Sequence, residues 1–451
     1  MNEKISLLVK GKIKEFHKSI NIPGDKSLSI RALILASQCI GLSKIKNLLE
    51  SEDVLNCVKS LRSLGVKITK KNNIYKVYGN GLNSYKTKNN LTKIYVGNSG
   101  TTARLLSGVL STQPGKFYLY GDSSMNKRDM SRVTKHLEKI GCFFYPSKKN
   151  TLPLTIIGTD MPLAQTHIEN IGSAQVKSAI LMAALNTPGT TQIIEKKISR
   201  NHTEIFLKKI NADIKIKKRK KENLISLKGQ KNIHGFNCSI SSDPSSSAFL
   251  IALALFTPKS QLIIKNVNCN KTRIGFLNIL VKKMNAKIKI KNLVKKINDE
   301  PVGDIYIKTS KLKPINCPKK IVPYLIDELP ILFIIAAMIK GVSKFSGIGE
   351  LRHKESDRIK TMENGLNKIG IKTKSTSTTL KIFGNPNIKF KKILKINPKE
   401  DHRIAMSWTI FGLLVKARVK INNFETVKTS FPNFISLIRS IGGQIEVKKK
   451  Y

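Results

Sequence analysis

One short pattern occurs six times in this sequence, and it limits the folds that the chain can adopt. Each copy consists of an apolar residue, two mostly polar residues, a second apolar residue, Gly or Asn, and a stretch typical of a strand. The copies are LRSLGVKI (61–68), LEKIGCFF (137–144), LKKINADI (207–214), VKKMNAKI (281–288), LNKIGIKT (366–373) and IRSIGGQI (438–445). Gly and Asn tolerate the left-handed backbone conformation that commonly ends a helix. Each copy therefore predicts the last turns of a helix, a left-handed residue and a strand.

The repeat is long and evenly spaced. Its Gly or Asn residues stand at positions 65, 141, 211, 285, 370 and 442, at intervals of 70 to 85 residues. Tetratricopeptide and ankyrin solenoids have repeats of about 33–34 residues and do not fit this period. A chain of 451 residues has room for two or three domains of roughly 150 residues each. The period therefore favours two lobes with three α/β units in each.

The chain is strongly basic, with 81 Lys and Arg residues against 29 Asp and Glu residues and a formal net charge of +52. Such a charge suits a nucleic-acid-binding protein, because cations release the counterions of a phosphate backbone. However, the lysines are spread along the chain and often alternate with isoleucine, as in KIKIK at 287–291. No RNA-recognition, zinc-finger or helix-turn-helix motif accompanies them. We therefore expect solvated lysine-rich surfaces and no specific nucleic-acid partner.

Neither a membrane span nor a metal site is expected. The longest apolar runs, at 329–339 and 404–415, are shorter than the roughly 18–20 residues that a transmembrane helix needs. The first residues lack the apolar segment of an export signal. The six cysteines are scattered, with no Cys-x-x-Cys pair, which is typical of reduced thiols inside the cell. We expect a soluble, cytoplasmic protein.

The segment PGDKSLSIRALILAS (23–37) carries the first group of chemically useful residues. Pro-Gly predicts a turn, and Asp25 or Ser27 can cap the helix that follows. Ser27 and Arg31 share one face of that helix because they are four residues apart. A helix start with backbone amides, a hydroxyl group, Lys26 and Arg31 is suited to bind an anion. A plain capped helix is the alternative.

Other motifs place polar or basic residues at the start of an apolar helix in the same way. They are GNSGTTARLL (97–106), GDSSMNKRDMSRV (121–133), SAQVKSAILMAAL (173–185), SRNHTE (199–204), DPSSSAF (243–249), DELPIL (327–332), ELRHKESDRI (350–359) and DHRIAM (401–406), and a further short motif, TSFPNF (429–434), comes after them in the chain. Within the segment 172–185, Ser173, Gln175 and Lys177 are expected ahead of an apolar helix. Helix starts that converge on one cleft would form a strong anion receptor. Its cations would be Lys26, Arg31, Arg128, Arg200, Lys354, Arg358 and Arg403.

Asp327 and Glu355 are the acids among these motifs whose placement suggests proton transfer. The alternatives are that Asp327 caps a helix and that Glu355 forms a surface ion pair with Arg358, three residues later. His202 and His402 are expected to make structural hydrogen bonds at helix starts rather than to bind a metal.

In this order, the motifs resemble those of the 5-enolpyruvylshikimate-3-phosphate synthase family, from about residue 20 to 445. The resemblance implies a two-lobed, inside-out α/β (α+β) barrel with six βαβαββ-like repeats, three per lobe. One lobe, residues 21–242, would carry most contacts to shikimate 3-phosphate. The other, residues 1–20 and 243–451, would carry Asp327, Glu355 and part of the phosphoenolpyruvate site.

The implied reaction transfers the enolpyruvyl group of phosphoenolpyruvate to the 5-hydroxyl of shikimate 3-phosphate and releases phosphate, a step of the shikimate pathway to chorismate and aromatic amino acids. It needs no metal or redox cofactor. The implied partners are the two small-molecule substrates, with no membrane and a monomeric chain. The nearest alternative in this fold is the enolpyruvyl transferase that acts on UDP-N-acetylglucosamine. Its loop cysteine is absent from these motifs, and its lysine is followed by Asn, whereas Ser27 follows Lys26 here.

The resemblance also implies residue roles. Asp327 would be the base for the 5-hydroxyl, and Glu355 and Lys26 are the candidates that protonate the methylene carbon. Shikimate 3-phosphate would contact Lys26, Ser27, Arg31, Ser173, Ala174, Gln175, Arg200, Asp327 and Lys354. Phosphoenolpyruvate would contact Lys26, Gly100, Arg128, Gln175, Arg358 and Arg403. The sequence departs from the family at Ile30, Ala103, Asp129 and Asn201, where His, Met, Pro and Asp are usual, and at Thr429, where some members carry Lys.

Overall fold

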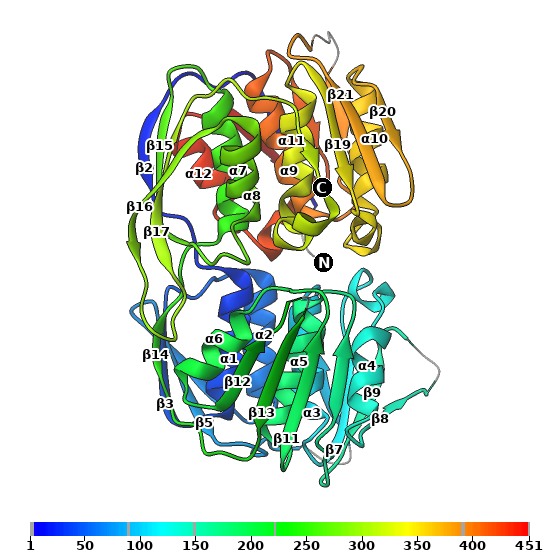
Figure 1. Cartoon of the computed structure of the whole chain (residues 1–451). Coiled ribbons are helices and arrows are strands. Elements are labelled where there is room, and N and C mark those ends of the chain that lie inside the picture. The colour runs from blue at the N-terminus through cyan, green and yellow to red at the C-terminus, as the bar shows by residue number, and fades with distance from the viewer. Residues whose placement is uncertain (1–3, 88–90, 148–149, 221, 389–392, 450–451) are drawn as a thin grey trace. The chain divides into compact units, whose positions relative to one another are not determined.

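The computed structural model describes residues 4–87, 91–147, 150–220, 222–388 and 393–449, and the chain divides into two units (Figure 1). The central unit contains Gly24–Ser241 and Lys295–Glu300, and the terminal unit contains Met1–Pro23, Ser242–Val294 and Pro301–Tyr451. The chain crosses from one unit to the other after Pro23 and again after Ser241, and these are its two main crossings. The boundaries expected from the sequence, after residues 20 and 242, differ from them by three residues and one residue. The excursion Lys295–Glu300 was not expected. It is held in the central unit by an ion pair from Lys209 Nζ to Asp299 (2.5 Å) and by a hydrogen bond between His202 Nδ1 and Glu300 Oε1 (2.6 Å).

The six repeats fold as the pattern predicts. The Gly or Asn residue of each copy has a positive φ, between +56° and +112°. Each lies between a helix and a strand of the same repeat. The helix and strand pairs are α2 (Glu52–Ser63) and β4 (Lys67–Lys71), α4 (Ser131–Glu138) and β8 (Phe143–Tyr145), α6 (His202–Lys209) and β12 (Asp213–Lys218), α8 (Gly275–Met284) and β16 (Lys287–Val294), α10 (Arg358–Lys368) and β20 (Thr373–Ser375), and α12 (Phe434–Ser440) and β24 (Ile445–Lys449).

Each copy contributes its strand to a different four-stranded sheet, and the six sheets of the described residues share one topology, in which one parallel pair is followed by two antiparallel pairs. The described residues of the central unit form the sheets β14-β3-β5-β4, β6-β7-β9-β8 and β10-β11-β13-β12. The strands not yet defined are β3 (Ile40–Lys46), β5 (Ile74–Asn80), β6 (Thr92–Tyr95), β7 (Gly115–Tyr120), β9 (Leu154–Gly158), β10 (Thr166–Glu169), β11 (Thr190–Glu195), β13 (Asn223–Lys228) and β14 (Asn237–Ser239).

The described part of the terminal unit has the same design, with sheets β22-β23-β1-β24, β2-β15-β17-β16 and β18-β19-β21-β20. The first of these sheets joins the two ends of the chain, because β1 pairs with β24 with Leu7 opposite Val447. The remaining strands are β1 (Ile5–Val9), β2 (His17–Ile20), β15 (Gln261–Asn268), β17 (Val302–Lys308), β18 (Asn316–Cys317), β19 (Gly341–Ser346), β21 (Thr379–Gly384), β22 (Leu394–Ile396) and β23 (Val419–Ile421).

The other helices form the interior of each unit. In the central unit these are α1 (Lys26–Gln38), α3 (Gly100–Leu110) and α5 (Ala174–Leu185), and in the terminal unit α7 (Pro244–Phe256), α9 (Leu329–Ala337) and α11 (His402–Leu414). Every residue of α9 is buried, as expected for a helix that is apolar on all sides. Helices α3 and α5 pack so closely that a Cβ on Gly108 would lie 2.1 Å from the carbonyl oxygen of Ala179. The predicted α/β fold, with helices inside and sheets outside each unit, is confirmed.

Among the described residues, no helix has both the length and the apolar character to cross a bilayer, and no three His, Cys, Asp or Glu side chains are grouped as metal ligands. The six cysteines are free thiols. Burial raises the pKa of Cys39 and Cys57 to about 12, so both thiols stay protonated at neutral pH.

Candidate active site

The interior helices of the central unit begin with polar caps. Asp25 Oδ1 accepts a hydrogen bond from the backbone amide of Leu28 (2.9 Å), so Asp25 rather than Ser27 caps α1. Ser99 caps α3, and Ser173 caps α5 by accepting from the Val176 amide (3.3 Å). The caps leave the hydroxyl of Ser27 and the first backbone amides of these helices at the helix starts, which carry partial positive charge.

Arg31 joins the starts of three helices. Its Nε donates to Thr203 on α6 (2.8 Å), its Nη2 donates to Ser178 on α5 (3.0 Å), and its Nη1 donates to the carbonyl of Ser27 (3.1 Å). The residue is only 2% exposed. Burial, opposed by Asp25 and Glu204 and assisted by nearby Arg200, lowers the pKa of Arg31 to about 10. Arg31 remains a cation at neutral pH, and the predicted site residues Ser27, Arg31 and Arg200 lie together.

A second group forms around the start of α3. A Cβ on Gly100 would lie 2.8 Å from Nη1 of Arg104 and 3.2 Å from Nη1 of Arg128. Arg104 donates to Oε1 of Gln175 (2.7 Å), and Gln175 donates to the hydroxyl of Thr101 (3.0 Å). Three predicted ligands, Gly100, Arg128 and Gln175, are therefore assembled around Arg104. Two guanidinium groups beside a glycine backbone form a receptor for an anion.

Lys26 lies at the first position of α1 and pairs with Asp53 of α2, with 2.8 Å between Nζ and Oδ2. Both side chains are largely buried. Asp53, a carboxylate from the neighbouring helix, therefore holds Lys26 in place.

The start of α5 is held by a different carboxylate. Ala174 is the first helical residue, and the amides of Gly172 and Ser173 donate to the carboxylate of Glu169.

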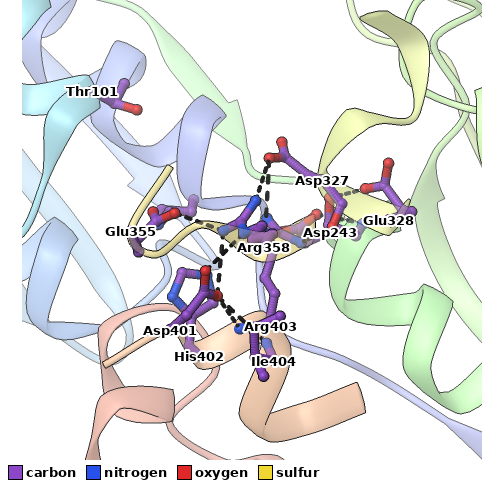
Figure 2. A network of polar contacts seen from close by, with 12 residues as sticks. Thr101, Asp243, Asp327, Glu328, Glu355, Arg358, Asp401, His402, Arg403 and Ile404 are labelled. Atoms are coloured by element: carbon purple, nitrogen blue, oxygen red, sulfur yellow. Dashed lines mark hydrogen bonds and ion pairs between the residues drawn. The ribbon is translucent and has the colours of Figure 1, made fainter. Parts of the chain in front are cut away.

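The terminal unit contains a dense ion-pair network around Arg358, the first residue of α10 (Figure 2). Its Nε donates to Asp401 (2.8 Å), and its Nη2 donates to Glu355 (2.6 Å). The Arg358 side chain is 1% exposed, so its pair with Glu355 is buried and not the surface pair considered from the sequence. Burial alone would lower the pKa of Arg358, but Asp401 and Glu355 overcome this effect and raise it.

Asp327 lies in the 3-10 turn Ile326–Glu328, just before α9. Its Oδ1 lies 3.7 Å from Nη1 of Arg358 and 3.8 Å from Nε of Arg403. Arg403 also donates to the backbone carbonyl of Asp327 (3.2 Å). Two guanidinium groups therefore hold this carboxylate, which is 19% exposed and can be reached from solvent. A carboxylate in this position is a candidate proton acceptor.

Lys354 directly precedes Glu355 and is half-buried. Burial lowers the pKa of Lys354 and Arg358 lowers it further, whereas Asp327 and Glu355 act in the opposite direction. The four predicted residues Asp327, Lys354, Glu355 and Arg358 are thus brought together with Arg403 in one part of the terminal unit. The group holds three cations and two candidate proton-transfer acids.

Comparison with known proteins identifies the family. The sequence model of the family EPSP synthase (3-phosphoshikimate 1-carboxyvinyltransferase) matches residues 10–438. The 3-phosphoshikimate 1-carboxyvinyltransferase of Zymomonas mobilis is 38% identical over 98% of this chain and 97% of its own length, and that of Petrotoga mobilis is 41% identical over 95% and 98%. The chain belongs to the EPSP synthase family. The resemblance read from the motifs is confirmed.

Solved structures agree with this membership. An EPSP synthase from Acinetobacter baumannii aligns with a TM-score of 0.84 and 36% identity over 99% of this chain and 100% of its own. The enolpyruvyl transferase NikO from Streptomyces tendae has the same fold (TM-score 0.78, full coverage of both chains) at only 11% identity. The fold is therefore more widely shared than the EPSP synthase sequence motifs.

One expectation about this member of the EPSP synthase family is wrong. Gln175 and Lys177 do not precede the apolar helix but lie inside α5, and the Lys177 side chain is 0% exposed. Its Nζ lies between Glu195 (2.6 Å) and Glu204 (2.7 Å). Lys177 is therefore a structural residue, because its charge is already neutralised by two buried carboxylates.

Sequence reasoning missed several residues that organise the site. Asp401 and Arg104 lie inside the motifs DHRIAM and GNSGTTARLL, where a carboxylate at a helix start and a guanidinium within the first helical turns could have drawn attention to them. Asp53 lies outside the motifs, and the local sequence gives no signal for its pairing with Lys26. These pairings join segments far apart in the chain, so they become visible only once the units have folded.

Proposed function

We propose that this chain is a 3-phosphoshikimate 1-carboxyvinyltransferase, which transfers the enolpyruvyl group of phosphoenolpyruvate to the 5-hydroxyl of shikimate 3-phosphate and releases phosphate. The observation that carries the proposal is the position of Asp327, whose carboxylate faces Arg358 and Arg403. This places a proton acceptor next to two anion-binding groups. Family membership over nearly the whole chain supports the same activity.

The two substrates would use the residue groups described above. Shikimate 3-phosphate would be bound by the group around Arg31, by Ser173, Ala174 and Gln175 at the start of α5, and by Lys26, Asp327 and Lys354. Phosphoenolpyruvate would be bound by the group around Gly100, by Lys26, and by Arg358 and Arg403. Both ligands are anions, so these cations offset the repulsion between them, and forked guanidinium groups match carboxylate and phosphate oxygens.

The chemistry is an addition followed by an elimination, which requires no electron transfer. Asp327 would accept the proton of the 5-hydroxyl as its oxygen bonds to the C2 atom of phosphoenolpyruvate, while Glu355 or Lys26 donates a proton to the methylene carbon. This gives a tetrahedral intermediate. Loss of a proton from the new methyl group and departure of phosphate then restore the double bond. The surrounding cations would stabilise the negative charge on the departing phosphate.

Phosphate release is the direct test. We expect the purified chain to release phosphate from phosphoenolpyruvate when shikimate 3-phosphate is added, and not when UDP-N-acetylglucosamine is added or when neither acceptor is present. Release with the UDP-sugar would support the alternative transferase. The sequence disfavours it, because Ser27 follows Lys26 and no cysteine lies in the motifs.

We also propose that the chain acts as a monomer in the cytoplasm. Each group of site residues in the described part of the chain is held by contacts within its own unit, as for Arg31 and Arg358. Sedimentation at a concentration that supports full activity checks the oligomeric state, and a dimer mass would contradict the monomer.

A further inference from the structure

A second charged network includes Glu328, the residue that follows Asp327, and the proposed chemistry does not use this network. The guanidinium of Arg273 lies 3.0 Å from Glu328 through Nη1 and 3.0 Å from Asp243 through Nη2. Its Nη2 also donates to the hydroxyl of Ser245 (2.6 Å), which in turn donates to Glu328. All four side chains are buried. Arg273 is therefore shared by two carboxylates in an environment that excludes water.

The network connects two functionally different places within the terminal unit. Glu328 directly follows Asp327 and forms the N-cap position of α9. Asp243 caps α7 and directly follows Ser242, where the chain enters the terminal unit. The Asp243 amide donates to the carbonyl of Pro23 (3.2 Å), the last residue before the other crossing. Figure 2 shows Asp243 and Glu328 close to Asp327.

The network restrains the backbone at Asp327. A buried carboxylate that loses its cation is strongly destabilised, so Glu328 cannot turn away from Arg273 without a large cost. Asp327 itself is fixed through its backbone carbonyl, which accepts a hydrogen bond from Nη1 of Arg403 (3.2 Å). Arg403 thus holds residue 327 and Arg273 holds residue 328, so the backbone that carries the Asp327 carboxylate has little freedom to turn.

We propose that Arg273 and Glu328 are positioning residues that orient Asp327 for proton transfer. The proposal rests on the proposed function, in which Asp327 is the base. Neither residue is assigned a contact with substrate. Their role is to keep the carboxylate in the geometry that the transfer step needs, since misplacement of a reacting group by about 1 Å can lower a rate roughly 100-fold.

The test uses the full-length chain with Glu328→Gln, and Arg273→Lys as the second variant. We expect Glu328→Gln to lower kcat by about 10- to 100-fold while both KM values change by less than about threefold. Loss of the Glu328 charge removes a negative charge from the residue that follows Asp327, so the acidic limb of the pH–rate profile should move to lower pH. Arg273→Lys keeps the charge but not the two-sided hydrogen bonding, and should fall between the wild type and Glu328→Gln.

The matched control is Glu195→Gln, which also removes one of two carboxylates around a buried cation, Lys177, but in the central unit. It should lose comparable stability with kcat within about twofold of the wild type. If Glu328→Gln and Glu195→Gln change kcat equally, or if Glu328→Gln keeps the wild-type kcat and pH profile, the positioning role is wrong.

Hydrogen exchange separates this proposal from the proposed function. Exchange of the amides of residues 326–329 should be faster in Glu328→Gln and unchanged in Glu195→Gln. Unchanged exchange in Glu328→Gln would overturn the positioning role even if the enzyme is inactive for another reason. Absence of phosphate release by the wild-type chain would instead overturn the proposed function.

Discussion

Arg358 and Asp401 form a buried ion pair, with 2.8 Å between Nε and Oδ2, and the two side chains are 1% and 0% exposed. The Oδ1 atom of the same carboxylate accepts from the backbone amides of Arg403 (2.9 Å) and Ile404 (3.4 Å). Asp401 therefore caps α11 and at the same time orients Arg358 at the start of α10. One carboxylate thus fixes the place of both arginines that face Asp327.

Replacement of Asp401 should therefore damage both stability and phosphoenolpyruvate binding. Asp401→Asn keeps an oxygen that can cap α11 but leaves the buried Arg358 without its main counter-charge, at a cost of about 3–5 kcal/mol in the free energy of unfolding. The KM for phosphoenolpyruvate should rise at least about tenfold, since hydrogen bonds to charged groups contribute roughly 1.5–3 kcal/mol. Urea unfolding and steady-state kinetics measure the two effects. Asp357→Asn is the control, because Asp357 caps α10 but pairs with a more exposed arginine, Arg352.

Asp327→Ala should separate binding from catalysis. Without the base, kcat should fall by about 10²- to 10⁴-fold. Calorimetry should find that shikimate 3-phosphate still binds, because the residues around Arg31 in the central unit are untouched. Full turnover by the variant would remove Asp327 from its proposed role.

The repeated architecture was predictable from the sequence because its signal is local. A Gly or Asn residue after an amphipathic helix needs only a few neighbouring residues to specify a left-handed turn, and all six have a positive φ. The helix starts in the motifs are also local, and Ser99, Ser173, Asp243 and Asp401 act as caps there.

The partners of the charged residues were not predictable in this way. The sequence suggested which cations lie near an anion site, but not that Asp53 holds Lys26 or that Asp401 holds Arg358. Lys177 was wrongly grouped with the residues at a helix start for the same reason. Glu195 and Glu204, which neutralise its charge, come from a strand and a helix further along the chain. Ion pairs between distant segments depend on the packing of the whole unit.

Gly100→Ala should weaken phosphoenolpyruvate binding with little effect on folding. The added Cβ would lie 2.8 Å from Nη1 of Arg104 and 3.2 Å from Nη1 of Arg128, so the ends of these side chains must move. We expect an increase in the KM for phosphoenolpyruvate of at least about tenfold, since a lost charged hydrogen bond costs roughly 1.5–3 kcal/mol. The midpoint of urea unfolding should stay close to that of the wild type. Gly11→Ala is the control, because a Cβ at Gly11 meets nothing within 4 Å.

Stability should fall below neutral pH in part because of His167. Its Nδ1 lies 3.3 Å from Nδ1 of His136, and burial, together with His136 and Lys139, lowers the pKa of His167 to about 4. The unfolded chain takes up this proton near the ordinary pKa of about 6.5. The contribution of neutral His167 is therefore present above pH 6.5 and is lost between about pH 6.5 and 4, with a slope of at most about 1.4 kcal/mol per pH unit.

Urea unfolding at several pH values tests this assignment. The stability of His167→Asn should depend less on pH over that range than the stability of the wild type. His234→Asn, at an exposed position, should retain the wild-type dependence. Equal slopes in the wild type and His167→Asn would show that the acid sensitivity comes from other groups.

Lys177→Met should destabilise the central unit strongly while leaving the proposed ligands in place. Burial alone would raise the pKa of Glu195, but Lys177 overcomes this effect and lowers it. Without the cation, Glu195 and Glu204 remain buried and negatively charged at a cost of about 3–5 kcal/mol. The pKa of Glu195 in the folded variant should then lie above that of the unfolded chain, so this penalty is smallest at low pH and grows as the pH rises through the raised value. The deficit relative to the wild type should therefore shrink between pH 7 and 5, and adding Glu195→Gln and Glu204→Gln should recover part of it. A deficit that does not change with pH would mean that Lys177 contributes by packing its aliphatic chain rather than by neutralising the two carboxylates.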